Sequence, residues 1–285
     1  MNASGSRGIA FDPKDTKTIY YGVNNMKPSF KTNGKQPDQL FNSKGILYKT
    51  TNGGKNWTEL PTGADEGFRT MGVFVDTTNS QNLWLGTFDQ DPKGGTKPNQ
   101  KGMLKSTDGG KTWKSYPQKL AMADVAVSPT KFDHVYTPLQ TTSGPPEAYY
   151  SVDGNAFQKS NSNVYALIGR YDPYDASGMR MLGYAPYNDP PALYESKDGG
   201  KSWTQYAELP KEVTAKKRDE FGSISISEIV WHPTDKNIVY MTGSAGTAWK
   251  STDGGKTWKS ILTLDTLGGP NKNKAGSEKS REPDQ

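Results

Sequence analysis

The chain has 285 residues and no cysteine, and its 35 basic residues outnumber its 30 acidic ones, which gives a net charge of +5. The absence of cysteine excludes disulfides, a thiol nucleophile and zinc–thiolate sites. Only 32% of the residues are apolar, and the apolar stretches are too short to cross a bilayer, so we expect no membrane insertion. Most of the basic residues are lysine, whereas readout of phosphates and bases favours arginine, so we expect no nucleic acid partner.

The chain opens, after a short polar segment without the apolar core of a signal peptide, on an alternating segment that starts at Gly8. An Asp-Pro turn and a second apolar segment, Ile19 to Gly22, follow it. The same order of strand, polar turn and strand returns in four further places: residues 72–86, 125–136, 169–183 and 229–240. Alternation on this length scale predicts a pair of β-strands each time.

A second motif follows each strand pair, and it centres on the residues Asp-Gly-Gly. Its four nearly complete copies are residues 50–57, 106–113, 196–203 and 251–258, and each ends in tryptophan. A decayed copy, Ser151 to Phe157, lies midway in the widest gap and ends in phenylalanine. Glycine tolerates the positive φ of a tight turn, and the aspartate can accept hydrogen bonds from its own turn. The motif therefore predicts a hairpin between two strands.

Five units of four strands fill the chain, and helical periodicity is absent. This pattern predicts an all-β fold, a five-bladed β-propeller with the motif between the third and fourth strands of each blade. The expected blades cover about residues 7–60, 68–117, 122–160, 163–209 and 223–263. Residues 264–285 are polar and are expected to form a disordered tail.

The hairpin motif resembles the Asp-box, or BNR repeat, Ser/Thr-x-Asp-x-Gly-x-x-Trp, and the chain resembles the Asp-box propeller superfamily. Together with the segment DPxxxxxIYxG it is most similar to the branch of xyloglucan-active endoglucanases and sortilin. The resemblance implies a secreted or cell-surface protein and leaves open that the chain is a fragment of a larger propeller. It also implies a structural role for the box residues, which are Asn52, Asp108, Asp153, Asp198, Asp253, Trp57, Trp113, Trp203 and Trp258.

Two carboxylates stand out when the first strands of the five units are aligned. Gly8, Gly72, Asp124, Ile168 and Glu228 then share one repeat position. A carboxylate on an otherwise apolar inner strand costs free energy unless it is paired or functional. Because glycoside hydrolysis uses two carboxyl groups, Asp124 and Glu228 are candidate catalytic residues. The alternative is that they cap the central channel or bind lysine or backbone groups.

Long connections between the second and third strands of several blades should gather on one face and form a binding rim. On or near this rim, Phe88, Tyr184 and Tyr187 could stack on a sugar ring or a peptide, and Arg69 could donate hydrogen bonds. These residues are the candidate ligand-binding set.

The expected function is that of a binding module, a monomer that recognises a polysaccharide or a protein segment through its long-loop face. The alternative is a glycoside hydrolase, endoglucanase-like or sialidase-like, and a scaffold or assembly role comes third. The endoglucanase segment Arg-Thr-Asp-x-Gly-Gly has methionine here, Met71, in place of its catalytic aspartate. The two histidines, His134 and His232, are too far apart in sequence for a metal-ligand motif, so we expect no metal and no cofactor.

Overall fold

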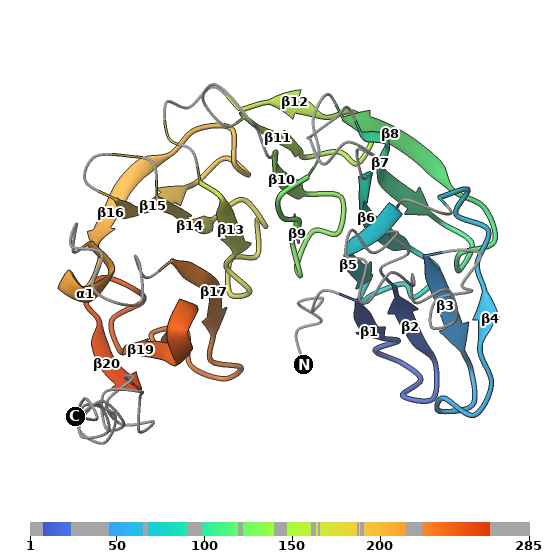
Figure 1. The fold of residues 1–285 in the computed structure, drawn as a ribbon, viewed down its shortest axis with the longest axis horizontal. Coiled ribbons are helices and arrows are strands. Elements are labelled where there is room, and N and C mark those ends of the chain that lie inside the picture. Colours follow the sequence, from blue (N-terminus) through green and yellow to red (C-terminus); the bar gives the residue numbers. More distant parts are fainter. Residues whose placement is uncertain are drawn as a thin grey trace, which may run out of the picture.

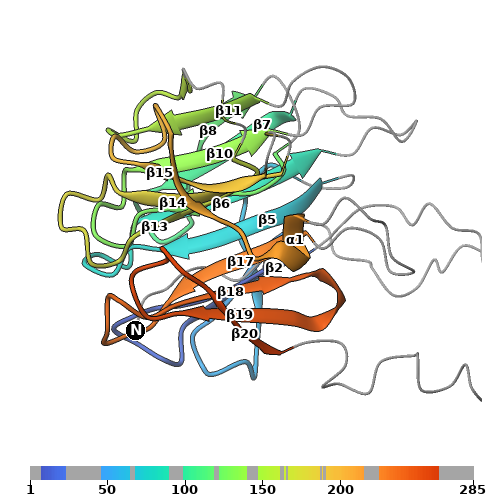
Figure 2. The same ribbon diagram turned by 90° about the vertical axis from the view of Figure 1, so that its left-hand side faces the viewer.

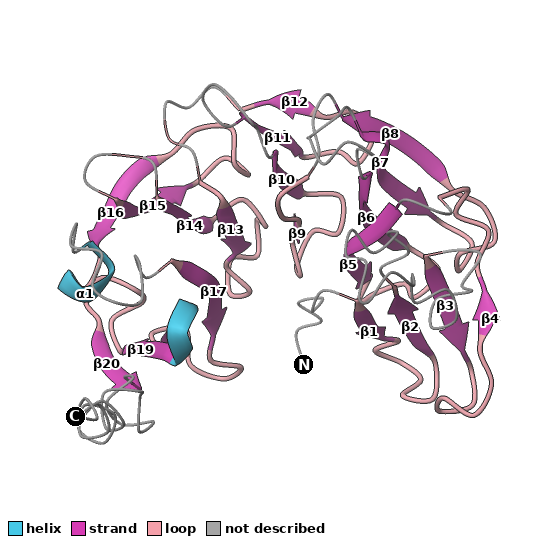
Figure 3. Cartoon of the chain, in the orientation of Figure 1, coloured by secondary structure: helices cyan, strands magenta, loops and turns pink. Residues whose placement is uncertain are grey.

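The computed structural model describes residues 8–23, 46–64, 68–89, 99–118, 122–139, 147–160, 164, 166–186, 188, 191–214 and 225–262. Within these ranges the strands form five antiparallel sheets of four strands, and each sheet follows the order of the chain. Figure 1 shows the sheets arranged around an arc as blades, with the first strand of each blade innermost. Almost all of the regular structure is β-strand (Figure 3), so the prediction of an all-β, five-bladed propeller is confirmed.

We number the blades 1 to 5 in chain order. Blade 1 contains β1 (Ile9–Phe11), β2 (Ile19–Gly22), β3 (Leu47–Thr50) and β4 (Thr58–Glu59). Blade 2 contains β5 (Phe68–Val75), β6 (Leu83–Asp89), β7 (Asn99–Ser106) and β8 (Lys114–Gln118). Blade 3 contains β9 (Ala126–Val127), β10 (Val135–Leu139), β11 (Glu147–Ser151) and β12 (Gln158–Lys159). Blade 4 contains β13 (Ile168–Tyr171), β14 (Met181–Ala185), β15 (Ala192–Ser196) and β16 (Thr204–Glu208). Blade 5 contains β17 (Ile226–Trp231), β18 (Val239–Gly243), β19 (Thr247–Ser251) and β20 (Lys259–Leu262).

Two short helices complete the described structure, α1 (Lys211–Thr214) and the 3₁₀ helix η1 (Ser244–Gly246). Neither of them has the length or the apolar character that crossing a bilayer requires, and the described ranges hold no other helix. Figure 2, turned by 90°, shows the strands running across the thickness of the molecule. The expected tail, residues 264–285, lies outside the described residues.

Each Asp-box lies in the hairpin between the third and fourth strands of its blade, as predicted. In blade 4, the Ser196 hydroxyl donates to Asp198 Oδ1 at 2.9 Å and accepts the Gly200 N–H at 2.8 Å. Gly200 has a φ of 96°, which a residue with a side chain rarely adopts. The same bond from a glycine N–H to a serine or threonine hydroxyl recurs in every blade, with donors Gly54, Gly110, Gly154, Gly200 and Gly255.

The box carboxylate ties down the far side of the same turn. In blade 5, Asp253 accepts the Thr257 N–H at 2.9 Å and the Thr257 hydroxyl at 2.6 Å. Asn52 of blade 1 accepts the Asn56 N–H at 3.0 Å in the same way. An amide therefore replaces the carboxylate without loss of the turn, and the structural role expected of the box residues agrees with these bonds.

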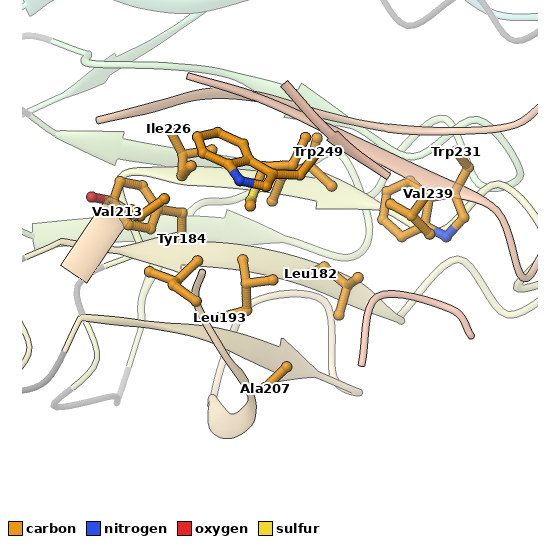
Figure 4. Close-up of a cluster of buried hydrophobic side chains, with 12 residues drawn as sticks. Leu182, Tyr184, Leu193, Ala207, Val213, Ile226, Trp231, Val239 and Trp249 are labelled. Carbon is orange, nitrogen blue, oxygen red and sulfur yellow. The ribbon is translucent and has the colours of Figure 1, made fainter. Parts of the chain in front are cut away.

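The apolar core lies between the blades and not inside any one of them. Four clusters of buried side chains join blade 1 to 2, 2 to 3, 3 to 4 and 4 to 5. Figure 4 shows the last of these, in which Ile226 and Trp249 of blade 5 lie over Leu182 and Leu193 of blade 4. Successive side chains of a strand point to opposite faces of its sheet, so each blade uses one face for each neighbour.

We call the face of a blade that meets the following blade its forward face, and the face that meets the preceding blade its backward face. In blade 2, Phe74 and Trp84 lie on the forward face, and Val73 and Leu85 lie on the backward face. Among the described residues, no apolar cluster joins blade 5 to blade 1, and the arc in Figure 1 stays open between them.

The Asp-box predicts a loss of stability in acid. The hydroxyl of Thr257, followed by N–H groups of the turn and the Ser251 hydroxyl, lowers the pKa of Asp253 from 3.8 to about 2. A carboxyl group whose pKa is lower in the folded state stabilises the fold above the unfolded pKa, and this stabilisation is lost as the pH falls through the folded pKa. Thermal melts of the wild-type chain should therefore lose stability between about pH 4 and pH 2.

The matched variant is Asp253→Asn, which keeps the turn, as Asn52 does, but has no carboxyl group to titrate. Its melting temperature should fall less than that of the wild type over the same pH range. Identical acid profiles for the two proteins would show that the box carboxylate does not stabilise the fold.

Candidate functional site

The inner strands of blades 3, 4 and 5 bring three charged side chains together. Asp124 lies just before β9, Arg170 is in β13 and Glu228 is in β17. Arg170 Nη1 donates to Asp124 Oδ2 at 2.5 Å, and Nη2 donates to Glu228 Oε2 at 2.9 Å. Arg170 Nε also donates to Glu228 Oε1, so the guanidinium holds Glu228 with two bonds. The structure therefore places the two predicted carboxylates around one arginine, and we call the three residues the inner triad.

The inner triad is partly withdrawn from solvent. The exposed fraction of the side chain is 6% for Asp124, 17% for Arg170 and 40% for Glu228. Burial alone would lower the pKa of Arg170, but the charges of Asp124 and Glu228 outweigh burial and raise it above its ordinary value. The guanidinium of Arg170 therefore stays charged.

The sequence also contains a signal for Arg170, separate from the alignment of the two carboxylates. Counted from the Asp-Pro turn, Ala10, Phe74, Ala126, Arg170 and Val230 occupy one repeat position. Arg170 is the one charged residue of this column. An arginine at a position that is otherwise apolar needs a partner, and acidic residues stand in the first strands of the blades on either side.

Three of the four predicted ligand-binding residues are described, and they lie in blade 2 (Arg69 and Phe88) and blade 4 (Tyr184). Tyr184 of β14 is 5% exposed and packs between blades 4 and 5. Phe88 of β6 is 8% exposed, and the guanidinium of Arg69 in β5 lies 4.2 Å from its ring centre. Tyr187 lies outside the described residues. Phe88 and Tyr184 are packing residues in this structure, Arg69 is ordered by Phe88, and a role in ligand binding stays a prediction for all four.

A polar hollow of about 400 Å³ lies between blades 2 and 3, near the turns that join their first and second strands. Asp76, Asn82, Lys131 and Asp153 are among its lining residues, as is His134. His134 is 8% exposed, and its Nδ1 lies 2.9 Å from the carbonyl oxygen of Gly178, so one ring nitrogen is engaged in packing blade 3 on blade 4. Across the described residues, no group of three or more acidic or histidine side chains could hold a metal ion.

Comparison with protein families agrees with the turn chemistry. The model of the BNR/Asp-box repeat matches residues 104–115, which contain the box of blade 2. The chain is a β-propeller that carries Asp-box repeats. No curated protein matches it by sequence.

Solved structures resemble this Asp-box propeller in fold. An ancestral GH74 enzyme superposes with a TM-score of 0.59 and 15% identity over 90% of this chain and 31% of the enzyme. The GH74 xyloglucanase from Xanthomonas campestris gives a TM-score of 0.58 and 14% identity over 92% of this chain and 39% of the enzyme. YCF48 bound to D1 peptide superposes less well, with a TM-score of 0.47 and 16% identity over 92% of this chain and 84% of that one.

The Asp-box propeller spans about a third of the length of the two GH74 enzymes. At these identities the likeness shows the fold alone, and a propeller hosts many chemistries. What the chain does has to be argued from its own side chains.

Removal of the central guanidinium should destabilise the propeller strongly. Arg170→Met leaves Asp124 buried without a countercharge, and breaking a buried ion pair in this way costs about 3–5 kcal/mol. Glu228→Gln should cost less, because Glu228 is more exposed and the amide still accepts a hydrogen bond. Chemical denaturation measures both.

The double variant Arg170→Met with Asp124→Asn provides the control. It should recover much of the lost stability, because the buried charge is removed together with its partner. If the free energy of unfolding of Arg170→Met lies within about 1 kcal/mol of the wild-type value, the triad does not stabilise the packing of the three blades.

Proposed function

We propose that this Asp-box propeller is a binding module for a polysaccharide or a protein segment, and not a glycoside hydrolase. The observation that carries the proposal is the position of Arg170 between Asp124 and Glu228. This position favours binding over hydrolysis. The Arg170 guanidinium lies between the two carboxylates, where glycoside hydrolysis would need a water molecule or the sugar.

A glycoside hydrolase with two carboxyl groups leaves a gap between them for the glycosidic bond or for a water molecule. In the inner triad this gap holds the guanidinium, which donates hydrogen bonds to both side chains. Hydrolysis by Asp124 and Glu228 would thus require Arg170 to leave, with Asp124 still buried.

Arg69 offers the chemistry that a binding module needs. It lies at the start of β5, beside the end of β6, where the connection to the next strand leaves the blade. The Arg69 guanidinium lies over the Phe88 ring, a contact that favours one orientation of a cation, and the Arg69 side chain is partly exposed. A guanidinium ordered in this way loses little entropy when it binds a carboxylate or sugar hydroxyls.

The proposal includes the expected setting of the protein. A polysaccharide ligand is consistent with a secreted or cell-surface location. The proposal includes no nucleic acid partner. Since one structure of similar fold is described as a xyloglucanase, xyloglucan is the first polysaccharide to test.

The test combines binding and turnover on a panel of soluble polysaccharides that includes xyloglucan. Calorimetry should detect binding by the wild type, and Arg69→Ala should weaken it about tenfold, or by about 1.4 kcal/mol. Lys236→Ala is the matched control, because it removes one positive charge from an exposed turn at the opposite end of a blade. It should bind as the wild type does.

Turnover is measured as release of reducing sugars from the same panel. The wild type should release none above background, and neither should Asp124→Asn or Glu228→Gln. Release by the wild type that either variant abolishes would show that the chain is a hydrolase and contradict the proposal.

A further inference from the structure

In the part of the chain that the structure describes, the backward face of blade 1 is apolar and exposed. Ile9 and Phe11 of β1 are 38% and 49% exposed, and Tyr21 of β2 is 47% exposed. Trp57 of the Asp-box is 42% exposed, and its ring lies 6.0 Å from that of Tyr21. The opposite face of the same strands is buried against blade 2. Four large apolar side chains on one sheet face form a patch of the kind that marks an interaction surface.

In the other blades, side chains at these positions pack against the preceding blade, and several of them are fully buried. The residues that correspond to Phe11 in blades 2, 4 and 5 are 3%, 5% and 7% exposed, and they are Val75, Tyr171 and Trp231. Trp203, which corresponds to Trp57, is 7% exposed. Phe11 and Trp57 are therefore exposed because none of the five described sheets packs against this face of blade 1.

The forward face of blade 5 also exposes apolar side chains that are buried in other blades. Val230 is 44% exposed, and Tyr240 is partly exposed. The corresponding residues of blade 3, Ala126 and Tyr136, are 4% and 0% exposed. Strand alternation puts Val230 opposite Ile229, which is buried against blade 4.

The completed interfaces show how two such faces fit. Tyr136, on the forward face of blade 3, has its ring 5.3 Å from that of Trp203, on the backward face of blade 4. Trp84 of blade 2 lies 6.0 Å from Phe157 of blade 3 in the same way. At the open ends of the arc, the residues in these two roles are Tyr240 and Trp57. Each molecule therefore carries both halves of an interface that it already forms four times.

From this continuity we infer that copies of the chain associate head to tail. The forward face of blade 5 in one copy packs on the backward face of blade 1 in another, with Tyr240 against Trp57. Because the two faces differ, the contact is heterologous, and it adds copies to a chain or closes them into a ring. The inference departs from the monomer expected from the sequence, and it does not depend on which ligand the propeller binds.

The decisive experiment is a complementation test by light scattering after gel filtration. The wild type should show a mass above 31.2 kDa that rises with concentration. Phe11→Asp destroys the backward face of blade 1, and Val230→Asp destroys the forward face of blade 5. Each variant alone should stay at the mass of one chain, whereas their mixture should form a heterodimer through the one intact pair of faces.

Val152→Asp is the matched control, since it places a charge on an equally exposed apolar residue outside both faces and should associate as the wild type does. A wild type that stays at the mass of one chain at every concentration would overturn the inference, whether the arc closes on itself or another molecule covers it. Association of Val230→Asp or Phe11→Asp alone would overturn the head-to-tail arrangement.

A second measurement does not depend on charged variants. The chain has no cysteine, so Phe11→Cys and Val230→Cys place a single thiol on each face. The corresponding residues Tyr171 and Ala126 share one buried cluster, so a short bifunctional thiol reagent should link the two variants in a mixture. Absence of the linked species would again overturn the inference.

Discussion

The structure depends on one constraint: a blade of four strands has two apolar faces and can bury neither of them by itself. Blades 2, 3 and 4 each meet a neighbour on both sides, so their strands carry buried residues on both faces. The Asp-box supports this packing, because its rigid turn delivers a large aromatic ring, such as Trp203, to the forward face of the preceding blade. Among the described residues, blades 1 and 5 each share an apolar cluster with one neighbour only, so one face of each is left exposed.

Much of the fold could be predicted because it is coded locally and repeated. The spacing of serine, aspartate, glycine and tryptophan fixes the same hairpin in each blade, and Asn52 shows that even a changed box keeps it. The open arc could not be predicted from the repeat. Phe11 and Trp231 occupy the same repeat position, but only Trp231 is covered by a neighbouring blade. The burial of Phe88 and Tyr184 depends on which face of a strand each occupies, and a shift of one residue reverses the face.

The candidate site was only half predictable for a similar reason. The alignment of first strands singled out Asp124 and Glu228, and the structure brings them to one place. What lies between them comes from blade 4, at a position that is apolar in the other blades. Arg170 donates hydrogen bonds to both carboxylates and so links blades 3, 4 and 5. The alignment of the carboxylates alone suggested a catalytic pair and gave no sign of this link.

Native-state hydrogen exchange tests the central constraint most directly. If burial between blades supplies the stability, dilute protein should show graded protection: peptides from β5–β16 should exchange slowest, and those from β1–β4 and β17–β20 should open at lower free energy. This gradient follows from blades 1 and 5 being covered on one side. Equal protection in all five blades would contradict the account, because it would mean that the end blades are as well covered as the middle ones.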